Sequence, residues 1–170
     1  GLVGSEMCIR DRGMNSAAIT DHGNMYGVVE FYKTAKAADI NPVIGCEIYV
    51  APNSRFDRET SHGEDRYYHL ILLAENNTGY ANLMKIVSIG FTEGYYYRPR
   101  VDFETLQKYH EGLICLSACL AGEVPRYIVR GFYEEAKGIA KKYQDCFGKD
   151  NYFLELQLSL IHISEPTRPI

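Results

Sequence analysis

Residues 17–50 read AAITDHGNMYGVVEFYKTAKAADINPVIGCEIYV, and this stretch decides the fold class. The short apolar run 17–20 predicts a buried strand, and the apolar residues of 27–38 recur at helical spacing. Asn41 and Pro42 are expected to end that helix, and the β-branched run 43–50 predicts a second strand. A strand, a helix and a second strand in this order indicate an α/β protein with a parallel sheet.

The same alternation continues to residue 157. Further strands are expected over 68–74, 113–117 and 152–157, and further helices over 80–91, 102–109, 124–130 and 133–147, the second of these capped by Asp102. The connections are expected to be a polar loop over 51–65, a turn over 76–79 and an aromatic, basic loop over 95–100. Five parallel strands would form more than half of a β/α barrel, either open or closed.

The composition is that of an ordinary globular domain, with 46% hydrophobic and 24% charged residues. No apolar run approaches the roughly 20 residues of a membrane span. A net charge of −4 argues against a generic nucleic-acid coat, although it permits a local basic groove. Five cysteines without a CxxC pair favour reduced thiols and a cytoplasmic location over a disulfide framework.

Both ends of the chain, 1–12 and 158–170, are expected to be non-native. When LSLIHISEPTR (158–168) is back-translated and the opposite DNA strand is read, the result is LVGSEMCIRD, the sequence of 2–11. The two ends are therefore translations of the two strands of one element, which resembles a transposase-type sequencing adapter. We exclude them from fold reasoning, together with Cys8 and His162, and expect a partial domain over 13–157 that is truncated on both sides.

The first candidate metal ligands are Asp21 and His22, which follow the first strand, where ligands gather in such folds. A divalent metal would suit this pair, with Asp21 either ligating it or orienting the His22 ring. The alternative is that Asp21 caps a helix and His22 is an exposed loop residue. Glu47 interrupts an apolar strand, where a buried carboxylate is costly unless it is paired or bound to a cation. Simple alternation, with Glu47 facing solvent, is the alternative there.

His69 and Cys119 are weaker candidates. His69 lies at the start of its strand, which is the wrong end for a site in a parallel barrel, and a lone histidine is more often structural. Cys119 follows the strand 113–117 at the right end, although most such thiols are small buried hydrophobes. Cys46 and Cys115 are assigned to the core, and Cys146 receives no functional role.

Residues 95–100, YYYRPR, combine stacking rings with the guanidinium groups of Arg98 and Arg100. Such an array could contact a nucleic-acid strand. The favoured interpretation is structural, with tyrosines packed on neighbouring elements and arginines paired with acids. His62 and His110 are expected to be solvated.

Three stretches carry a resemblance to a known family: 18–52, 69–102 (HLILLAENNTGYANLMKIVSIGFTEGYYYRPRVD) and 112–124 (GLICLSACLAGEV). They resemble the PHP domain at the front of bacterial DNA polymerase III alpha subunits. The TDH triplet alone is typical of the whole PHP superfamily, which includes phosphatases. NNTGYANL, YYYRPRVD and LSACLAGE are more specific to the replicative polymerase, and the resemblance covers essentially all of 13–157.

This resemblance implies an incomplete, distorted (β/α)7 barrel with a polynuclear metal centre at one mouth. It implies His22, Glu47, His69 and Cys119 as ligands to divalent ions (Zn, Mn or Mg). The parent protein would be a DNA-directed DNA polymerase, a nucleotidyltransferase of DNA replication. Its partners would be DNA, deoxynucleotides and other replicase subunits, including a proofreading subunit and a sliding clamp, with no membrane.

The resemblance leaves three hypotheses for the domain itself. It could carry a 3′–5′ exonuclease that proofreads DNA ends, it could be a structural scaffold stabilised by metal, or it could be a free-standing PHP phosphoesterase. The isolated fragment is expected to be inactive.

Overall fold

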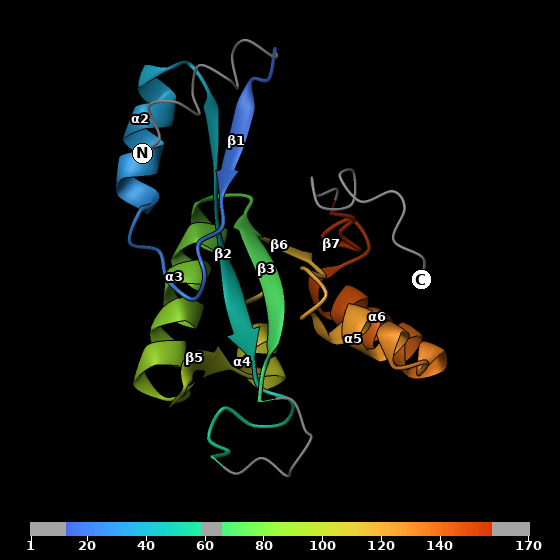
Figure 1. The fold of residues 1–170 in the computed structure, drawn as a ribbon. Helices are drawn as coiled ribbons and strands as arrows, with labels where there is room; N and C mark the ends of the chain where they lie inside the picture. The colour runs from blue at the N-terminus through green and yellow to red at the C-terminus, as the bar shows by residue number, and fades with distance from the viewer. Residues whose placement is uncertain (1–12, 59–65, 158–170) are drawn as a thin grey trace, which may run out of the picture.

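The computed structural model describes residues 13–58 and 66–157, and Figure 1 shows their arrangement. The first unit consists of β1 (Ser16–Ile19), α2 (Val28–Ala37) and β2 (Asn41–Val50), with β1 and β2 parallel. Helix α2 buries an apolar stripe of Val28, Phe31 and Ala35. This confirms the unit expected from the periodicity of 17–50.

One boundary in this unit was predicted wrongly, because β2 already includes Asn41 and Pro42. Pro42 pairs with Ala17 of β1, whereas β3 pairs with β2 only from Gly45 onward. The strand has a single neighbour at Pro42, so a residue without an N–H is tolerated there.

The sheet is mixed, and the expectation of an all-parallel sheet was wrong. Strand β3 (Tyr68–Ala74) is antiparallel to both β2 and β6 (Leu113–Leu116). The described part of the 51–67 connection contains no helix, so the chain turns back beside β2 without the crossover that a parallel neighbour needs. The strand order is β4-β5-β2-β3-β6-β7, with β1 on β2, and the described strands do not close into a barrel.

The remaining elements follow the prediction with three differences. They are β4 (Tyr95–Tyr96), β5 (Arg98–Val101), β7 (Tyr152–Phe153), α3 (Asn77–Thr92), α4 (Phe103–Tyr109), α5 (Glu123–Val129) and α6 (Tyr133–Phe147). Helix α3 begins inside the expected turn, because the Asn76 side chain caps it by accepting a hydrogen bond from Gly79 N at 3.0 Å. Strands β4 and β5 form an antiparallel hairpin in place of the expected loop, and β7 is only two residues long.

The core lies between the sheet and the helices packed against it. Its most buried members come from every central element: Cys46, Leu72, Leu83, Ile86, Leu106, Leu113, Cys115 and Tyr143. The assignment of Cys46 and Cys115 to the core is confirmed. In Figure 1, α2 and α3 lie along one side of β2, and α5 and α6 lie beyond β6. Strands β2 and β3 are thus held rigidly, and both carry candidate ligands. No helix formed by the described residues is both long and apolar enough to cross a membrane.

Candidate metal centre

The loop after β1 continues alongside β2 and places His22 next to Glu47. Glu47 N donates to Asp21 O at 3.0 Å, and Gly23 N donates to Glu47 O at 2.8 Å. Gly23 has a φ of +70°, and a Cβ there would lie 2.7 Å from the Tyr49 ring. Only glycine fits this turn without strain, so the backbone geometry itself directs His22 toward β2.

A buried thiol also stabilises this loop through hydrogen bonds. Cys46 Sγ donates to the carbonyl oxygens of Asp21 and Asn24, each at 3.3 Å. Burial raises the pKa of Cys46 to about 12, so the thiol keeps the proton that it donates. Cys46 therefore belongs to the support of the site and not to its ligands.

The antiparallel pairing of β3 explains the position of His69. Tyr49 lies opposite His69 and Glu47 lies opposite Ile71. Because side chains alternate along strands, Glu47 and His69 are diagonal neighbours on one face. A strand that runs in the reverse direction begins where its neighbour ends. The apparent wrong end of the strand is therefore the end at which His22 also lies.

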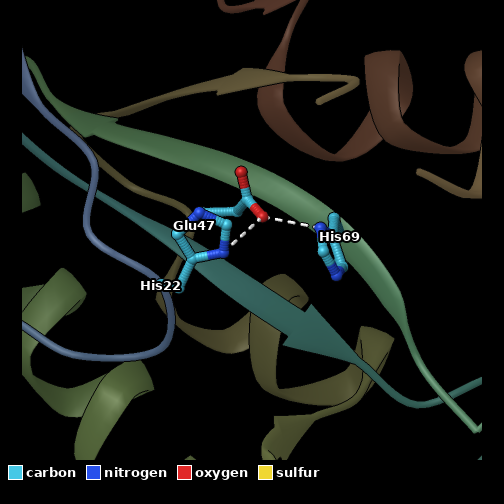
Figure 2. A group of neighbouring side chains, drawn as sticks. All are labelled: His22, Glu47 and His69. Carbon is cyan, nitrogen blue, oxygen red and sulfur yellow. Dashed lines mark ion pairs between the residues drawn. The ribbon is translucent and has the colours of Figure 1, made fainter. Parts of the chain in front are cut away.

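Three side chains converge at this point, as Figure 2 shows. The Nδ1 atoms of His22 and His69 lie 3.1 and 2.6 Å from Glu47 Oε1. One ligand atom from each residue lies within 4.8 Å of the others. Glu47 is only 7% exposed, which rules out the solvent-facing alternative, whereas the His22 side chain is open to solvent. These residues come from a loop, β2 and β3.

The shared carboxylate oxygen has no hydrogen bond of suitable geometry. Glu47 Oε1 is buried and the two ring nitrogens lie within ion-pair distance of it, but neither contact has the geometry of a hydrogen bond. A buried, unsatisfied carboxylate oxygen is unfavourable, and a cation held by it and the two imidazoles would compensate for this. Two imidazoles and a carboxylate are a common donor set for divalent metals, so the residues fit a metal ion.

The electrostatics around His69 agree with this donor set. Burial lowers the pKa of His69, and the neighbouring Glu47 carboxylate offsets part of that effect. A lowered pKa favours the neutral ring, which is the form that coordinates a metal.

Cys119 adjoins this cluster through His69 alone. Its Sγ lies 3.6 Å from His69 Nδ1 and accepts a hydrogen bond from Ala121 N at 3.5 Å. His69 N in turn donates to Ala121 O at 3.0 Å, so the β6–α5 turn is fixed to β3. The half-buried thiol lies beside the three converging residues without joining their shared oxygen.

Asp21 is exposed, and the described residues give its carboxylate no hydrogen bond to the His22 ring. The cap of α2 is Gly27, so Asp21 does not cap that helix either. Its contribution in this structure comes from its backbone oxygen, which accepts from Glu47 N and from the Cys46 thiol.

The two arginines of YYYRPR have different environments. Arg100 is 1% exposed and donates to the carbonyl oxygens of Arg66 and Gly94, so it has no surface to offer a nucleic acid. Burial lowers its pKa. Arg98 is exposed, so of these two arginines only Arg98 remains a candidate DNA contact.

His110 is the other histidine among the described residues, and it lies outside the cluster. His110 is half-buried, and its Nδ1 lies 2.8 Å from Gln107 O. His62, His162 and Cys8 fall outside the described residues. Cys146 is half-buried and packs against the core.

Sequence reasoning missed two rings beside the cluster, Tyr49 and Tyr67. The Tyr49 ring lies 5.3 Å from the His69 ring, and Tyr67 is stacked with His69 at 6.0 Å. The alternation of side chains along a strand could have revealed both rings. Residues 47 and 49 point to one face of β2, and residues 67 and 69 point to one face of the segment that leads into β3.

Comparison with known proteins gives a consistent result. The model of the PHP domain matches residues 8–159. The chain is 54% identical over 145 residues to DNA polymerase III subunit alpha of Treponema pallidum, which covers 85% of this chain and 12% of the relative. It is 49% identical to the same subunit of Borreliella burgdorferi over 144 residues, with the same coverage, and 44% identical to that of Aquifex aeolicus over 157 residues (89% and 13%). The chain thus spans only about an eighth of the length of these relatives.

Proposed function

Because this chain belongs to the PHP domain family, we propose that it holds divalent metal at His22, Glu47 and His69 and hydrolyses 3′ ends of DNA as part of a replicative polymerase. The observation that carries this proposal is Glu47 Oε1, a buried oxygen that has two imidazole nitrogens within ion-pair distance but no hydrogen bond of suitable geometry. A cluster built only for stability would gain more from a satisfied hydrogen bond at that atom.

The donor atoms suggest which ions would fit. Imidazole and a nearby thiolate favour zinc, and the carboxylate also accepts manganese or magnesium. Cys119 would join as a ligand by a small movement of its side chain, since its sulfur already lies 3.6 Å from His69 Nδ1. A divalent ion at this place would act as a Lewis acid toward a phosphodiester.

The chain's own residues would orient and shield the reaction. Glu47 and His69 are fixed by the β2–β3 ladder, so their donor atoms are preorganised. The rings of Tyr49 and Tyr67 close one side of the cluster and limit water there. The exposed His22 side leaves a direction from which a DNA end can approach.

The activity of the whole protein is part of the same proposal. Relatives that match 82–89% of the chain are named DNA polymerase III subunit alpha. We therefore assign the parent protein to DNA-directed DNA synthesis in the cytoplasm, on DNA and deoxynucleotides, together with other replicase subunits such as a proofreading subunit and a sliding clamp.

A structural role is the second candidate, and one observation favours it. The three residues come from three separate segments, so a metal bound by them would tie the β1–α2 loop to β2 and β3. In that case metal would stabilise the fold without any hydrolysis.

A nuclease assay on the full-length parent protein distinguishes the exonuclease from the structural role. Single-stranded DNA labelled at its 5′ end should be shortened from the 3′ end only with added metal. His22→Ala should abolish this activity, whereas His110→Ala, a histidine outside the cluster, should not. Hydrolysis that is absent, or equal in His22→Ala, would overturn the exonuclease proposal. A metal-dependent rise in stability without hydrolysis would support the structural role.

A further inference from the structure

Arg98 is an exposed cation beside the candidate metal centre. It begins β5, its guanidinium lies 5.6 Å from the centroid of the Tyr49 ring, and it donates a hydrogen bond to Tyr67. None of the described carboxylates forms an ion pair with it. The hydrogen bond to Tyr67 favours the charged guanidinium and raises the pKa of Arg98. Its charge is therefore fixed in place but not neutralised by a described residue.

Two rings connect Arg98 to the metal ligands. Tyr49 and Tyr67 lie 5.0 Å apart, and both contact the ring of His69. Arg98 contacts the Tyr49 ring, and His69 contacts both rings of this aromatic pair. A ligand that extends from the cluster along the pair would therefore meet Arg98.

A second arginine and an exposed ring lie next to this pair. Tyr97 occupies the β4–β5 turn with a φ of +60°, and its ring is 62% exposed. The guanidinium of Arg66 lies 4.4 Å from the centroid of that ring. Arg58, also exposed, donates to the carbonyl oxygens of Glu93, which caps α3, and of Tyr95 in the hairpin. Three exposed guanidinium groups thus surround one hairpin in a chain whose net charge is −4.

Exposed rings interleaved with guanidinium groups are suited to single-stranded nucleic acid. Guanidinium forks bind phosphate, and open aromatic faces stack on unpaired bases. A duplex would not present its bases to Tyr97, because they are stacked inside the helix. A small phosphate ester would not need a surface that extends from the cluster to the hairpin.

We propose that Arg98 binds a backbone phosphate of single-stranded DNA whose 3′ end lies at the His22–Glu47–His69 cluster, and that Tyr97, with Arg66, receives the next base. This inference rests on the proposed hydrolysis for the direction of the strand, because the end must lie at the cluster. It adds the residues that would select a single strand.

Photocross-linking of the full-length parent protein tests whether the DNA strand lies at Arg98 and Tyr97, and it does not require hydrolysis. The probe is an oligonucleotide that carries 4-thiothymidine next to its 3′ end, and the products are mapped by mass spectrometry. Adducts are expected on the peptide that contains residues 95–98. Arg98→Gln should lower the yield about tenfold, as expected for the loss of one charge-assisted phosphate contact. Arg98→Lys should restore part of it.

Lys85→Gln provides the matched control, since Lys85 is an exposed cation of α3 whose Nζ lies 5.6 Å from the ring of Tyr109 in α4. Its cross-linking should equal that of the unchanged protein. The 3′-end hydrolysis should show the same pattern, with KM raised about tenfold in Arg98→Gln and kcat changed much less.

The outcomes separate the two proposals. Adducts at the hairpin without hydrolysis would support this inference and refute the exonuclease. Metal-dependent hydrolysis with no adduct at 95–98, or equal yields for Arg98→Gln and Lys85→Gln, would overturn this inference and leave the exonuclease intact. Circular dichroism and the Arg98→Lys variant would reveal any loss of yield that is due to misfolding.

Discussion

Replacing Glu47 by glutamine should have opposite effects on the metal-free and metal-bound protein. In the metal-free protein, the buried Glu47 Oε1 has two imidazole nitrogens within ion-pair distance but no hydrogen bond of suitable geometry. An unsatisfied buried polar group costs about 1–3 kcal/mol, and a charged one costs more. Glutamine removes the charge, and its amide can donate to the Nδ1 atom of a neutral His69. We therefore expect the metal-free protein to become more stable around β2 and β3 by about 1–3 kcal/mol.

The same substitution removes the carboxylate that the metal would need. At a metal concentration of about 100 times Kd, binding would stabilise the unchanged protein by about 2.7 kcal/mol. Glu47→Gln should lose nearly all of this gain. The variant is thus expected to be the more stable protein without metal and to respond little to added manganese or zinc.

Hydrogen exchange of the backbone amides in β2 and β3 measures this difference, because it reports local opening without requiring two-state unfolding. Exchange in metal-free Glu47→Gln should be about 5- to 140-fold slower than in the unchanged protein. Glu30→Gln, an exposed acid on α2, is the matched control, and the amides of α6 serve as an internal reference. Faster exchange in metal-free Glu47→Gln, or full protection of that variant by metal, would refute the reasoning.

Three further predictions follow from other parts of the structure. Gly23→Ala should destabilise the protein by about 1–3 kcal/mol in urea unfolding and weaken metal binding, because Gly23 has a φ of +70° and a Cβ there would lie 2.7 Å from the Tyr49 ring. Gly138→Ala is the control. Gly138 faces open space on α6, so this change should stabilise the protein by about 0.4–1 kcal/mol. Burial raises the pKa of Asp102, but hydrogen bonds from Arg55 and Thr105 outweigh it and lower that pKa below the usual 3.8. The ionised Asp102 should therefore contribute its full share of the free energy of unfolding above pH 3.8, and this share should disappear as the pH falls through the lowered pKa. Urea unfolding of Asp102→Asn should not show this loss of stability in acid. Amplification outward from the codons of Gly13 and Gln157 in the source DNA should give flanking sequences different from 1–12 and 158–170, and recovery of the present ends would refute their origin in an adapter.

Much of the fold could be predicted from the sequence, because local patterns determine it. The helical spacing of 27–38 and the β-branched run of 43–50 correspond to α2 and β2 within a few residues. The direction of β3 could not be predicted in this way. Strand direction depends on how the chain returns through the 51–67 connection, and an apolar run such as LILL is compatible with either direction.

The residues proposed for the site could be named from the sequence, but their arrangement in space could not. His22 and Glu47 were identified by their chemistry, and the structure brings them together through the bridge beside β2. His69 seemed misplaced only because β3 was assumed to be parallel. Arg100 is a different case, since its buried guanidinium is satisfied by the carbonyl groups of Arg66 and Gly94, which local sequence patterns do not reveal. No periodicity could have distinguished it from Arg98.

The pairing of β2 with β3 also determines which mutations could disable the centre without touching a ligand. A shift of one residue along this ladder would place Leu70 opposite Tyr49 and would turn His69 to the other side of the sheet. An insertion or deletion within either strand would therefore separate the donor atoms even though His22, Glu47 and His69 were all retained. Changes of length in the connection before Tyr68 do not shift the register of this ladder. An inventory of ligand residues in a related chain is thus insufficient to identify a working centre, and the spacing between the residues within each strand must be read as well.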